Sequence, residues 1–319
     1  MRLLVIHHPY ARPRFELDFM QRLSKQPGVC VAAADLEALA EGRLIAPAPL
    51  AQFDAVVMFV AFNRLRTAAA LDWQGFTGRR VLFDHDAIQT YSDIFDDRLA
   101  GAWPAEFRRH KFDLLLTSSG AVRERLEADG VPAAWLPKGF EASRFADRPG
   151  PRAGLTSYGS AYACRKIAER ALREGGVPVE RIDTVPYPDL PGELARYLAC
   201  MAVSSDLDVR HAERATLAAV AARDVAMRPG LEPMAKFFEA AGAGCCPVAD
   251  AMADLSALGF RDGETAILFR SHAELVEKIR WWIERPDALR DLGRAAARKA
   301  HSAHSWAHRA AALPALLAG

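Results

Sequence analysis

Residues 223–250 read RDVAMRPGLEPMAKFFEAAGAGCCPVAD, and this stretch decides the fold. A short apolar strand is expected over Val225–Met227, followed by a Pro-Gly turn. A helix is expected to begin near Pro233, because a proline fits the first helical turn, where its missing N–H would have no partner. A second apolar strand is expected over 245–249. Strand, helix and strand in this order form the unit that builds parallel sheets.

The start of this expected helix carries the chemistry. Free backbone N–H groups and the positive end of the helix dipole attract a phosphate at such a position. Lys236 would add a full positive charge, and Glu239, one turn further on, could accept hydrogen bonds from sugar hydroxyls. This combination suits a nucleotide-sugar. An ordinary amphipathic helix with a solvated lysine and glutamate is the alternative.

The composition of the whole chain excludes several classes of protein. The chain has 319 residues, 51% hydrophobic and 25% charged, which is typical of a globular protein with two domains. A formal net charge of +1 gives no field that would select nucleic acid. Five irregularly spaced cysteines favour reduced thiols over a disulfide framework or a zinc site. Without a signal peptide or an apolar run of about 20 residues, a cytoplasmic protein is expected.

Apolar strands alternate with helices over the first half of the chain, which favours a doubly wound parallel sheet. The run 55–60, AVVMFV, is apolar throughout, as expected for a strand covered on both faces. The apolar spacing within 15–23 predicts a helix. Further strands are expected within the runs 3–6, 28–35, 79–86, 112–119 and 133–137.

Polar side chains follow several of these strands. Ligands of doubly wound sheets bind beyond the carboxyl ends of the strands. His7, His8 and Tyr10 come after the first strand, and His85 and Asp86 after the run 81–83. They are candidates for binding a second substrate and for catalysis. A histidine that simply faces a loop is the alternative for each.

A Pro/Gly-rich stretch, 146–154, separates the two halves, so a domain boundary is expected near residue 150. Beyond it, Gly159 and Ser160 precede an expected helix over 161–173 and would leave its N-terminus accessible to a phosphate. Arg165 is expected to act together with Lys236. Lys166 is the alternative, because adjacent residues cannot share one helix face. Further expectations are a helix over 191–201, a strand over 202–208, a turn and strand over 262–269, and a helical tail over 271–313.

Two of these stretches resemble GT-B glycosyltransferases, close to glycosyltransferase family 4 and its short bacterial relatives. Residues 232–248, EPMAKFFEAAGAGCCPV, match the outline of two glutamates followed by a small-residue turn. Six residues separate Glu232 from Glu239, where the family has seven. Residues 114–145 match the family pattern of strand, helix, strand and P-x-G-[hydrophobic]-D-x-x-x-F, with Glu141 replacing the aspartate.

The resemblance implies two Rossmann-like domains facing a cleft, with the C-terminal helix crossing back to the first domain. The expected bounds are 1–150 for the acceptor domain, 151–302 for the donor domain and 303–319 for the returning helix. It implies a retaining transfer from a nucleotide-diphosphate-sugar, which is the co-substrate, without a metal or other cofactor. The implied catalytic residues are His85, Arg165 and Lys236; the donor-binding residues are Gly159, Ser160, Glu232 and Glu239; and the acceptor-side candidates are His7, His8, Tyr10 and Asp86.

Other functions stay open at this point. An inverting transferase would need a base, and His85, Asp86, His7 or His8 could serve. The D-x-D matches at 84–86 and 206–208 could hold a metal. A non-catalytic nucleotide-sugar or glycan-binding protein could keep the same fold. A hydride-transferring enzyme is disfavoured, because no G-x-G-x-x-G follows the first strand. The acceptor could be a glycan, a lipid-linked compound or a small molecule. The basic run 108–111, RRHK, is a candidate for contact with anionic lipid at a membrane surface or with the acceptor.

Overall fold

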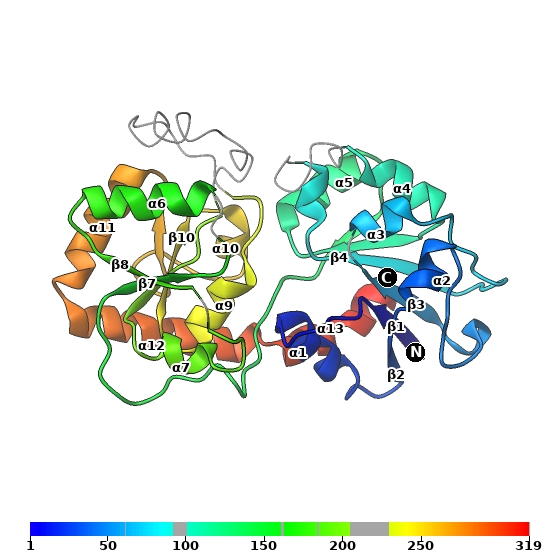
Figure 1. The fold of residues 1–319 in the computed structure, drawn as a ribbon, viewed down its shortest axis with the longest axis horizontal. Coiled ribbons are helices and arrows are strands. Elements are labelled where there is room, and N and C mark those ends of the chain that lie inside the picture. The colour runs from blue at the N-terminus through cyan, green and yellow to red at the C-terminus, as the bar shows by residue number, and fades with distance from the viewer. Residues whose placement is uncertain (61, 92–100, 161–162, 184, 205–229, 319) are drawn as a thin grey trace. The chain divides into compact units, whose positions relative to one another are not determined.

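The computed structural model describes residues 1–60, 62–91, 101–160, 163–183, 185–204 and 230–318. The chain divides into two compact units, Met1–Pro137 with Trp306–Gly319, and Lys138–Ser305 (Figure 1). Each unit contains one parallel sheet. The domain bounds expected from the sequence stay predictions. The expected strand at 225–227 and the D-x-D match at 206–208 lie outside the described residues.

The first unit is built on a sheet with the strand order β2-β1-β3-β4-β5-β6, in which every neighbouring pair is parallel. This confirms the predicted doubly wound parallel sheet. β3 is buried along its whole length, as its apolar sequence requires for a strand covered on both faces. The strands are β1 Leu3–His7, β2 Val29–Ala33, β3 Ala55–Phe59, β4 Arg79–Asp84, β5 Leu114–Thr117 and β6 Ala133–Trp135.

The C-terminal helix, α13 (Trp306–Ala318), belongs to the first unit and packs against α1 (Phe15–Leu23). Trp306 is buried, and its ring lies 4.9 Å from the ring of Phe19. This confirms the expected return of the last helix and the predicted bounds of α1. The remaining helices of the unit are α2 Leu36–Ala40, α3 Phe62–Thr67, α4 Trp103–Arg109 and α5 Gly120–Ala128, with 3-10 turns at Leu50–Gln52 and Ala87–Thr90.

The second unit contains a five-stranded parallel sheet with the order β11-β10-β9-β7-β8. The helix expected over 191–201 is wrong for its last residues, because the chain forms a strand over Ala199–Met201. There Ala199 pairs with Leu155 of one neighbouring strand and Cys246 of the other, and this buried pairing overrides the helical pattern. The strands are β7 Leu155–Tyr158, β8 Val179–Ile182, β9 Ala199–Met201, β10 Cys246–Asp250 and β11 Ile267–Phe269.

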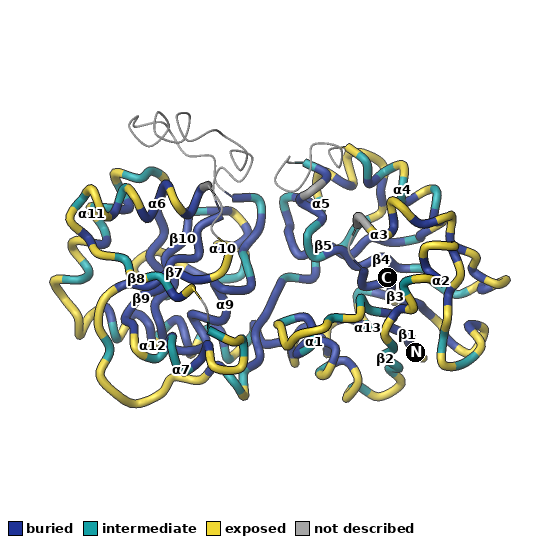
Figure 2. Tube along the Cα trace, in the orientation of Figure 1, coloured by how far each residue is buried: buried dark blue, intermediate teal, exposed yellow. Residues whose placement is uncertain are grey.

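Helices surround this second sheet, and Figure 2 shows β7, β9, β10 and β11 buried and many of the helix surfaces exposed, whereas β8 at the edge is only partly buried. Ser271 caps α11, accepting a hydrogen bond from the backbone N–H of Glu274 at 3.1 Å. Within the described ranges, no helix is both long and apolar enough to cross a membrane. The helices are α6 Ala163–Glu174, α7 Leu190–Leu194, α9 Ala235–Gly242, α10 Ala253–Ala257, α11 His272–Ile283 and α12 Pro286–Ala303.

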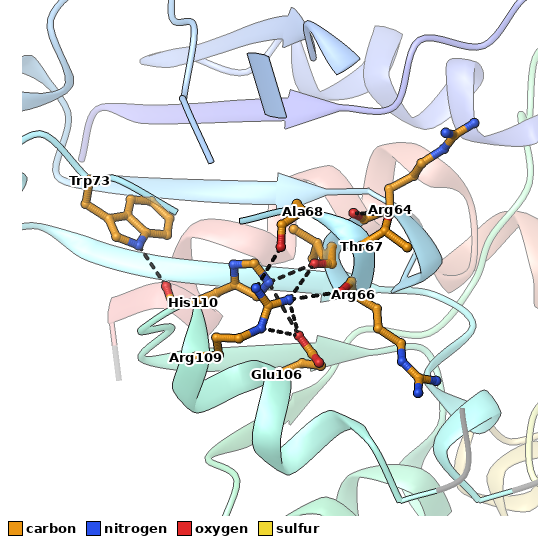
Figure 3. A network of polar contacts seen from close by, with 9 residues as sticks. Arg64, Arg66, Thr67, Ala68, Trp73, Glu106, Arg109 and His110 are labelled. Atoms are coloured by element: carbon orange, nitrogen blue, oxygen red, sulfur yellow. Dashed lines mark hydrogen bonds and ion pairs between the residues drawn. The ribbon is translucent and has the colours of Figure 1, made fainter. Parts of the chain in front are cut away.

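A polar network in the first unit closes the end of α3 (Figure 3). The Arg109 guanidinium donates to the carbonyl oxygens of Ala68 at 2.7 Å and Leu65 at 2.8 Å. His110 Nε2 donates to the same Leu65 carbonyl at 2.9 Å, and the His110 carbonyl accepts from Trp73 Nε1 at 2.8 Å. These bonds satisfy carbonyls that a helix end leaves without intrahelical partners.

The basic run 108–111 is divided between the interior and the surface. His110 is fully buried, and Arg109 bonds to backbone carbonyls, whereas Arg108 and Lys111 are exposed. Contact of this run with a lipid or an acceptor stays a prediction, which only the two exposed side chains could serve.

Lowering the pH should destabilise the first unit through His110. Burial lowers the pKa of His110, and the charge of Arg109 lowers it further, so the folded chain keeps the ring neutral. Below about pH 6.5, His110 binds a proton in the unfolded chain but stays neutral in the folded chain. The free energy of unfolding therefore falls as the pH falls below about 6.5. Denaturant unfolding at about pH 7.5 and 5.5, followed by tryptophan fluorescence, measures the loss. His110→Gln should reduce it.

His301→Gln is the matched control. His301 also bonds a backbone carbonyl through Nε2, that of Gly242 at 3.0 Å, but it is only half-buried. This variant should keep the pH dependence of the wild-type protein. Equal pH dependence in the wild type and His110→Gln would contradict the assignment.

Candidate functional site

The turn that follows β7 brings two buried cations together. Gly159 continues the chain after Tyr158 with a φ of +78°, a left-handed conformation that favours glycine. A Cβ atom at Gly159 would lie 3.2 Å from Lys236 Nζ and 3.9 Å from Arg165 Nη1. Gly159 and Ser160 are exposed, whereas Arg165 and Lys236 are 2% and 7% exposed. Two positive groups therefore lie next to an accessible glycine turn at the carboxyl edge of the sheet.

Backbone carbonyls hold both cations in place. Arg165, in the first turn of α6, donates from Nη1 to the Ser160 carbonyl at 2.5 Å. Lys236, in the first turn of α9, donates from Nζ to the Tyr158 carbonyl at 2.5 Å and lies 4.9 Å from the centroid of the Tyr158 ring. The structure thus brings together the two cations that the sequence analysis paired. Lys166, the alternative, is exposed on α6.

The positive charge of Arg165 makes the charged form of Lys236 less favourable, because the two groups repel each other. Burial lowers the pKa of Lys236 well below its ordinary value, and the nearby Arg165 guanidinium lowers it further. Little water reaches the pair to screen the repulsion. An anion that contacted both groups would therefore be bound with a gain in electrostatic energy, and would favour the charged form of Lys236.

Glu239 lies on the same helix as Lys236 and is buried. Its Oε2 accepts a hydrogen bond from the Tyr158 hydroxyl at 2.5 Å. Burial and this carboxylate raise the pKa of Tyr158 far above its ordinary value, so the hydroxyl stays protonated and donates. Tyr158, Gly159, Arg165, Lys236 and Glu239 form one group, named here the Gly159 cluster.

Glu232 is held differently. It is 1% exposed and forms an ion pair with Lys138, which is 3% exposed. The Glu232 carbonyl accepts from Ser204 Oγ at 3.2 Å. The carboxylate of Asp250 accepts from the backbone N–H groups of Ser204 at 2.8 Å and Gly230 at 2.5 Å. The segment leading into α9 is therefore fixed to the ends of β9 and β10.

Three residues of this region were not found by the sequence analysis. Tyr158 and Lys138 stand in short apolar or turn segments with no motif of their own. Arg181, on β8, donates to the Gly159 carbonyl at 2.5 Å and forms an ion pair with Glu169 at 2.9 Å. Only the pairing of β8 with β7 could have placed Arg181 beside this turn, and the sequence does not reveal that pairing.

A second group of polar residues surrounds His85 in the first unit. His85 Nε2 lies 3.3 Å from Asp86 Oδ2 and 3.5 Å from Glu16 Oε1. The imidazole stacks on the ring of Phe59 at 5.0 Å and meets the ring of Phe15 edge-on at 5.7 Å. The sequence analysis singled out His85 and Asp86 but missed Glu16. An acidic residue in the first turn of a helix is common because it favours the helix dipole, so it gave no signal.

His7 is the last residue of β1, His8 and Tyr10 follow it, and the three lie next to one another. His7 Nδ1 donates to the His8 carbonyl at 2.7 Å, and the Tyr10 ring lies 5.0 Å from the ring of His8. The Arg14 guanidinium lies 4.7 Å from the centroid of the Tyr10 ring. Burial lowers the pKa of His8, and the charges of Arg64 and Arg14 lower it further, which favours its neutral form. The predicted residues after the first strand thus form a local group.

The D-x-D match at 84–86 does not present two open carboxylates. Asp84 is 2% exposed and accepts hydrogen bonds from Trp103 Nε1 at 2.8 Å and the Asp86 backbone N–H at 3.0 Å. Burial raises the pKa of Asp84 to about 7. Asp206 and Asp208 lie outside the described residues. Among the residues described, no three or more His, Cys, Asp or Glu side chains are grouped to hold a metal ion.

Comparison with known proteins gives one family match and several similar folds. The profile of a family described as Glycosyl transferase-like matches residues 144–315, more than half of the chain. No curated protein matches the sequence. HepE of Anabaena in complex with UDP-glucose gives a TM-score of 0.64 at 13% identity, covering 100% of this chain and 99% of that chain. Sucrose-phosphate synthase from Thermosynechococcus elongatus gives 0.61 at 11% identity, covering 99% and 98%.

T4 phage BGT in complex with its UDP-glucose substrate gives a TM-score of 0.56 at 10% identity, covering 99% of this chain and 98% of that chain. At such identities the likeness establishes the fold alone. Two parallel α/β units with a C-terminal helix belonging to the first unit are the GT-B fold, which confirms the predicted fold class.

Breaking the buried ion pair of Lys138 and Glu232 should destabilise the second unit. Lys138→Met leaves the Glu232 carboxylate buried without its cation, so the free energy of unfolding should fall by about 3–5 kcal/mol. Denaturant unfolding measures the change. The double variant Lys138→Met/Glu232→Gln carries neither charge and should recover much of the loss. If the double variant loses as much free energy of unfolding as the two single variants lose together, the two charges are not coupled.

Proposed function

This chain belongs to the Glycosyl transferase-like family, and from that premise we propose that it transfers a sugar from a nucleotide-diphosphate-sugar to an acceptor hydroxyl with retention of configuration. It is a nucleotide-sugar-dependent glycosyltransferase by family, and the finer assignments that follow are part of the proposal. UDP is the nucleotide proposed for the first tests, because HepE and T4 phage BGT are described in complex with UDP-glucose.

The meeting of Arg165 and Lys236 at Gly159 is the observation that carries the proposal. A diphosphate offers two negative groups close together, which matches two cations beside one glycine turn. The first turns of α6 and α9, which carry these cations, also supply the positive ends of two helix dipoles. As the bond to the sugar breaks, charge grows on the departing diphosphate, and positive groups already in place stabilise that charge. In this proposal, the positive charge that stabilises the departing diphosphate comes from Arg165, Lys236 and the two helix N-termini.

The other residues of the second unit complete the proposed donor site. The exposed backbone of Gly159 and Ser160 would let a phosphate approach the cations. Glu239, fixed by the Tyr158 hydroxyl, would accept hydrogen bonds from the ribose hydroxyls. We assign Glu232 a supporting role toward the donor, because its ion pair with Lys138 fixes the segment that leads into α9.

In the first unit, His85 is the residue proposed to touch the transferred sugar, and His7, His8, Tyr10 and Asp86 are proposed to bind the acceptor. Aromatic rings with neighbouring hydrogen-bonding groups suit the apolar faces and hydroxyls of a sugar. These residues follow β1 and β4 at the carboxyl edge of the first sheet, where ligands of parallel sheets bind.

An inverting reaction is the second candidate function, and the His85 group favours it. An imidazole beside two carboxylates can accept a proton from an acceptor hydroxyl, as a general base must. Proton NMR of the product glycoside separates the two reactions. With an α-configured donor such as UDP-glucose, retention gives an α-glycoside. A β-glycoside would overturn the retaining assignment and leave the rest of the donor site unaffected.

UDP should raise the melting temperature, and Lys236→Met or Arg165→Met should remove most of that rise. A hydrogen bond to a charged group contributes about 1.5–3 kcal/mol, so each variant is expected to bind UDP about 10- to 100-fold more weakly. Calorimetric titration with UDP measures the affinity, and melting without ligand shows whether the variant is folded.

Lys166→Met is the matched control. Lys166 follows Arg165 directly on α6 and carries the same charge as Lys236, but its side chain is exposed. It should bind UDP like the wild-type protein. If Lys166→Met weakens binding as much as Arg165→Met does, the effect is one of general charge and the Gly159 cluster is not the donor site.

A further inference from the structure

Glu16 is a buried carboxylate that the proposed function does not use. It stands in the first turn of α1, and its side chain is 0% exposed. Oε2 accepts a hydrogen bond from Arg14 Nε at 2.6 Å. Oε1 accepts no hydrogen bond from the described residues and lies 3.5 Å from His85 Nε2. A carboxylate oxygen that is buried this way loses the water that would stabilise its charge, so its position beside an imidazole needs an explanation.

The His85 ring has little freedom to turn. It stacks on Phe59, its edge faces Phe15, and its backbone carbonyl accepts from Ser118 Oγ at 2.6 Å. With the ring plane fixed by packing, the remaining variable is which nitrogen carries the hydrogen. That choice follows from the groups facing each nitrogen.

The groups facing Nε2 are negative. Glu16 Oε1 lies 3.5 Å away and Asp86 Oδ2 lies 3.3 Å away, from two different elements. The Asp86 side chain is 32% exposed, so water and salt screen its charge, whereas Glu16 is shielded from both. The buried Asp84 and the half-exposed Arg14 complete the charged surroundings. Of the two carboxylates, Glu16 is the one whose effect on the ring is not screened by water and salt, although Arg14 pairs with its other oxygen.

We propose that Glu16 is a positioning residue for His85, which keeps the hydrogen of the ring on Nε2 and the ring in its observed orientation. In the neutral imidazole, Nδ1 is then the acceptor, which suits a hydroxyl group of a sugar. This step rests on the proposed function, since it assigns the His85 ring to the substrate. Glu16 itself reaches no substrate, because it is covered completely. Carboxylates that orient a functional histidine act in the same way in other sites.

The experiment compares the wild-type protein with Glu16→Gln. Gln has the shape of Glu without the charge, so the chain should still fold. Nitrogen NMR of protein labelled in its histidine rings reports which nitrogen of His85 carries the hydrogen. His85→Gln identifies the resonances. We expect the Nε2–H form in the wild-type protein and a mixture of the two forms in Glu16→Gln. We also expect kcat to fall about 10- to 100-fold, the range seen when a carboxylate that orients a metal-binding histidine is removed, with KM for the donor nearly unchanged.

Glu106→Gln is the matched control. Glu106 Oε2 lies 3.6 Å from Nε2 of another histidine, His110, and also pairs with Arg109. This variant loses a carboxylate beside an imidazole in the same unit but away from His85. It should melt at a lower temperature while the His85 resonances and kcat stay as in the wild-type protein. A change of the His85 resonances in Glu106→Gln equal to that in Glu16→Gln would overturn the proposal.

If Glu16→Gln does not fold, the spectrum of the wild-type protein still tests the proposal. A predominant Nδ1–H form of His85 in that spectrum would overturn it. Unchanged His85 resonances and kcat in a folded Glu16→Gln would do the same. Both results leave UDP binding by the second unit untouched. Conversely, a wild-type protein that binds no UDP would refute the proposed donor site, while the NMR comparison would still decide the role of Glu16.

Discussion

The repulsion between the Arg165 guanidinium and the Lys236 ammonium is the constraint on which the second unit depends. Two buried like charges are costly, and the chain offsets the cost with carbonyls of the β7 turn. Glycine is favoured at position 159, because φ is +78° and a Cβ atom there would lie 3.2 Å from Lys236 Nζ. A site that is costly without an anion binds one more tightly, since the positive groups are ordered before the ligand arrives.

The surrounding polar bonds make this arrangement rigid. Asp250 joins the ends of two segments by accepting from Ser204 and Gly230, and Lys138 holds Glu232 in the segment that follows. The start of α9 is thereby set relative to the sheet, and with it the position of Lys236. Buried charges that are fully paired can serve to define one conformation even when they add little stability. The pairing of Glu232 fits that role.

Periodicity predicted most of the elements, because helices and buried strands leave strong apolar patterns. The bounds of α1 and the apolar strand β3 are examples. The prediction failed at Ala199–Met201, where pairing on both sides within a buried sheet outweighs local preference. It also missed Tyr158, Arg181 and Glu16. Arg181 and Glu16 lie beside predicted residues only because of strand pairing or helix packing, which spacing along the chain does not reveal. Tyr158 directly precedes Gly159, but only the fold brings its hydroxyl to Glu239.

The two units differ in what the family match can explain. The matched region, 144–315, contains the whole Gly159 cluster, whose chemistry is that of binding an anion. The His85 group lies outside it and is assembled from α1, β3 and the residues that follow β4. Its aromatic rings, carboxylates and imidazole suit hydroxyl groups rather than phosphates. The family match therefore covers the residues proposed to bind the donor, whereas the residues proposed to bind the acceptor are brought together only in the folded first unit.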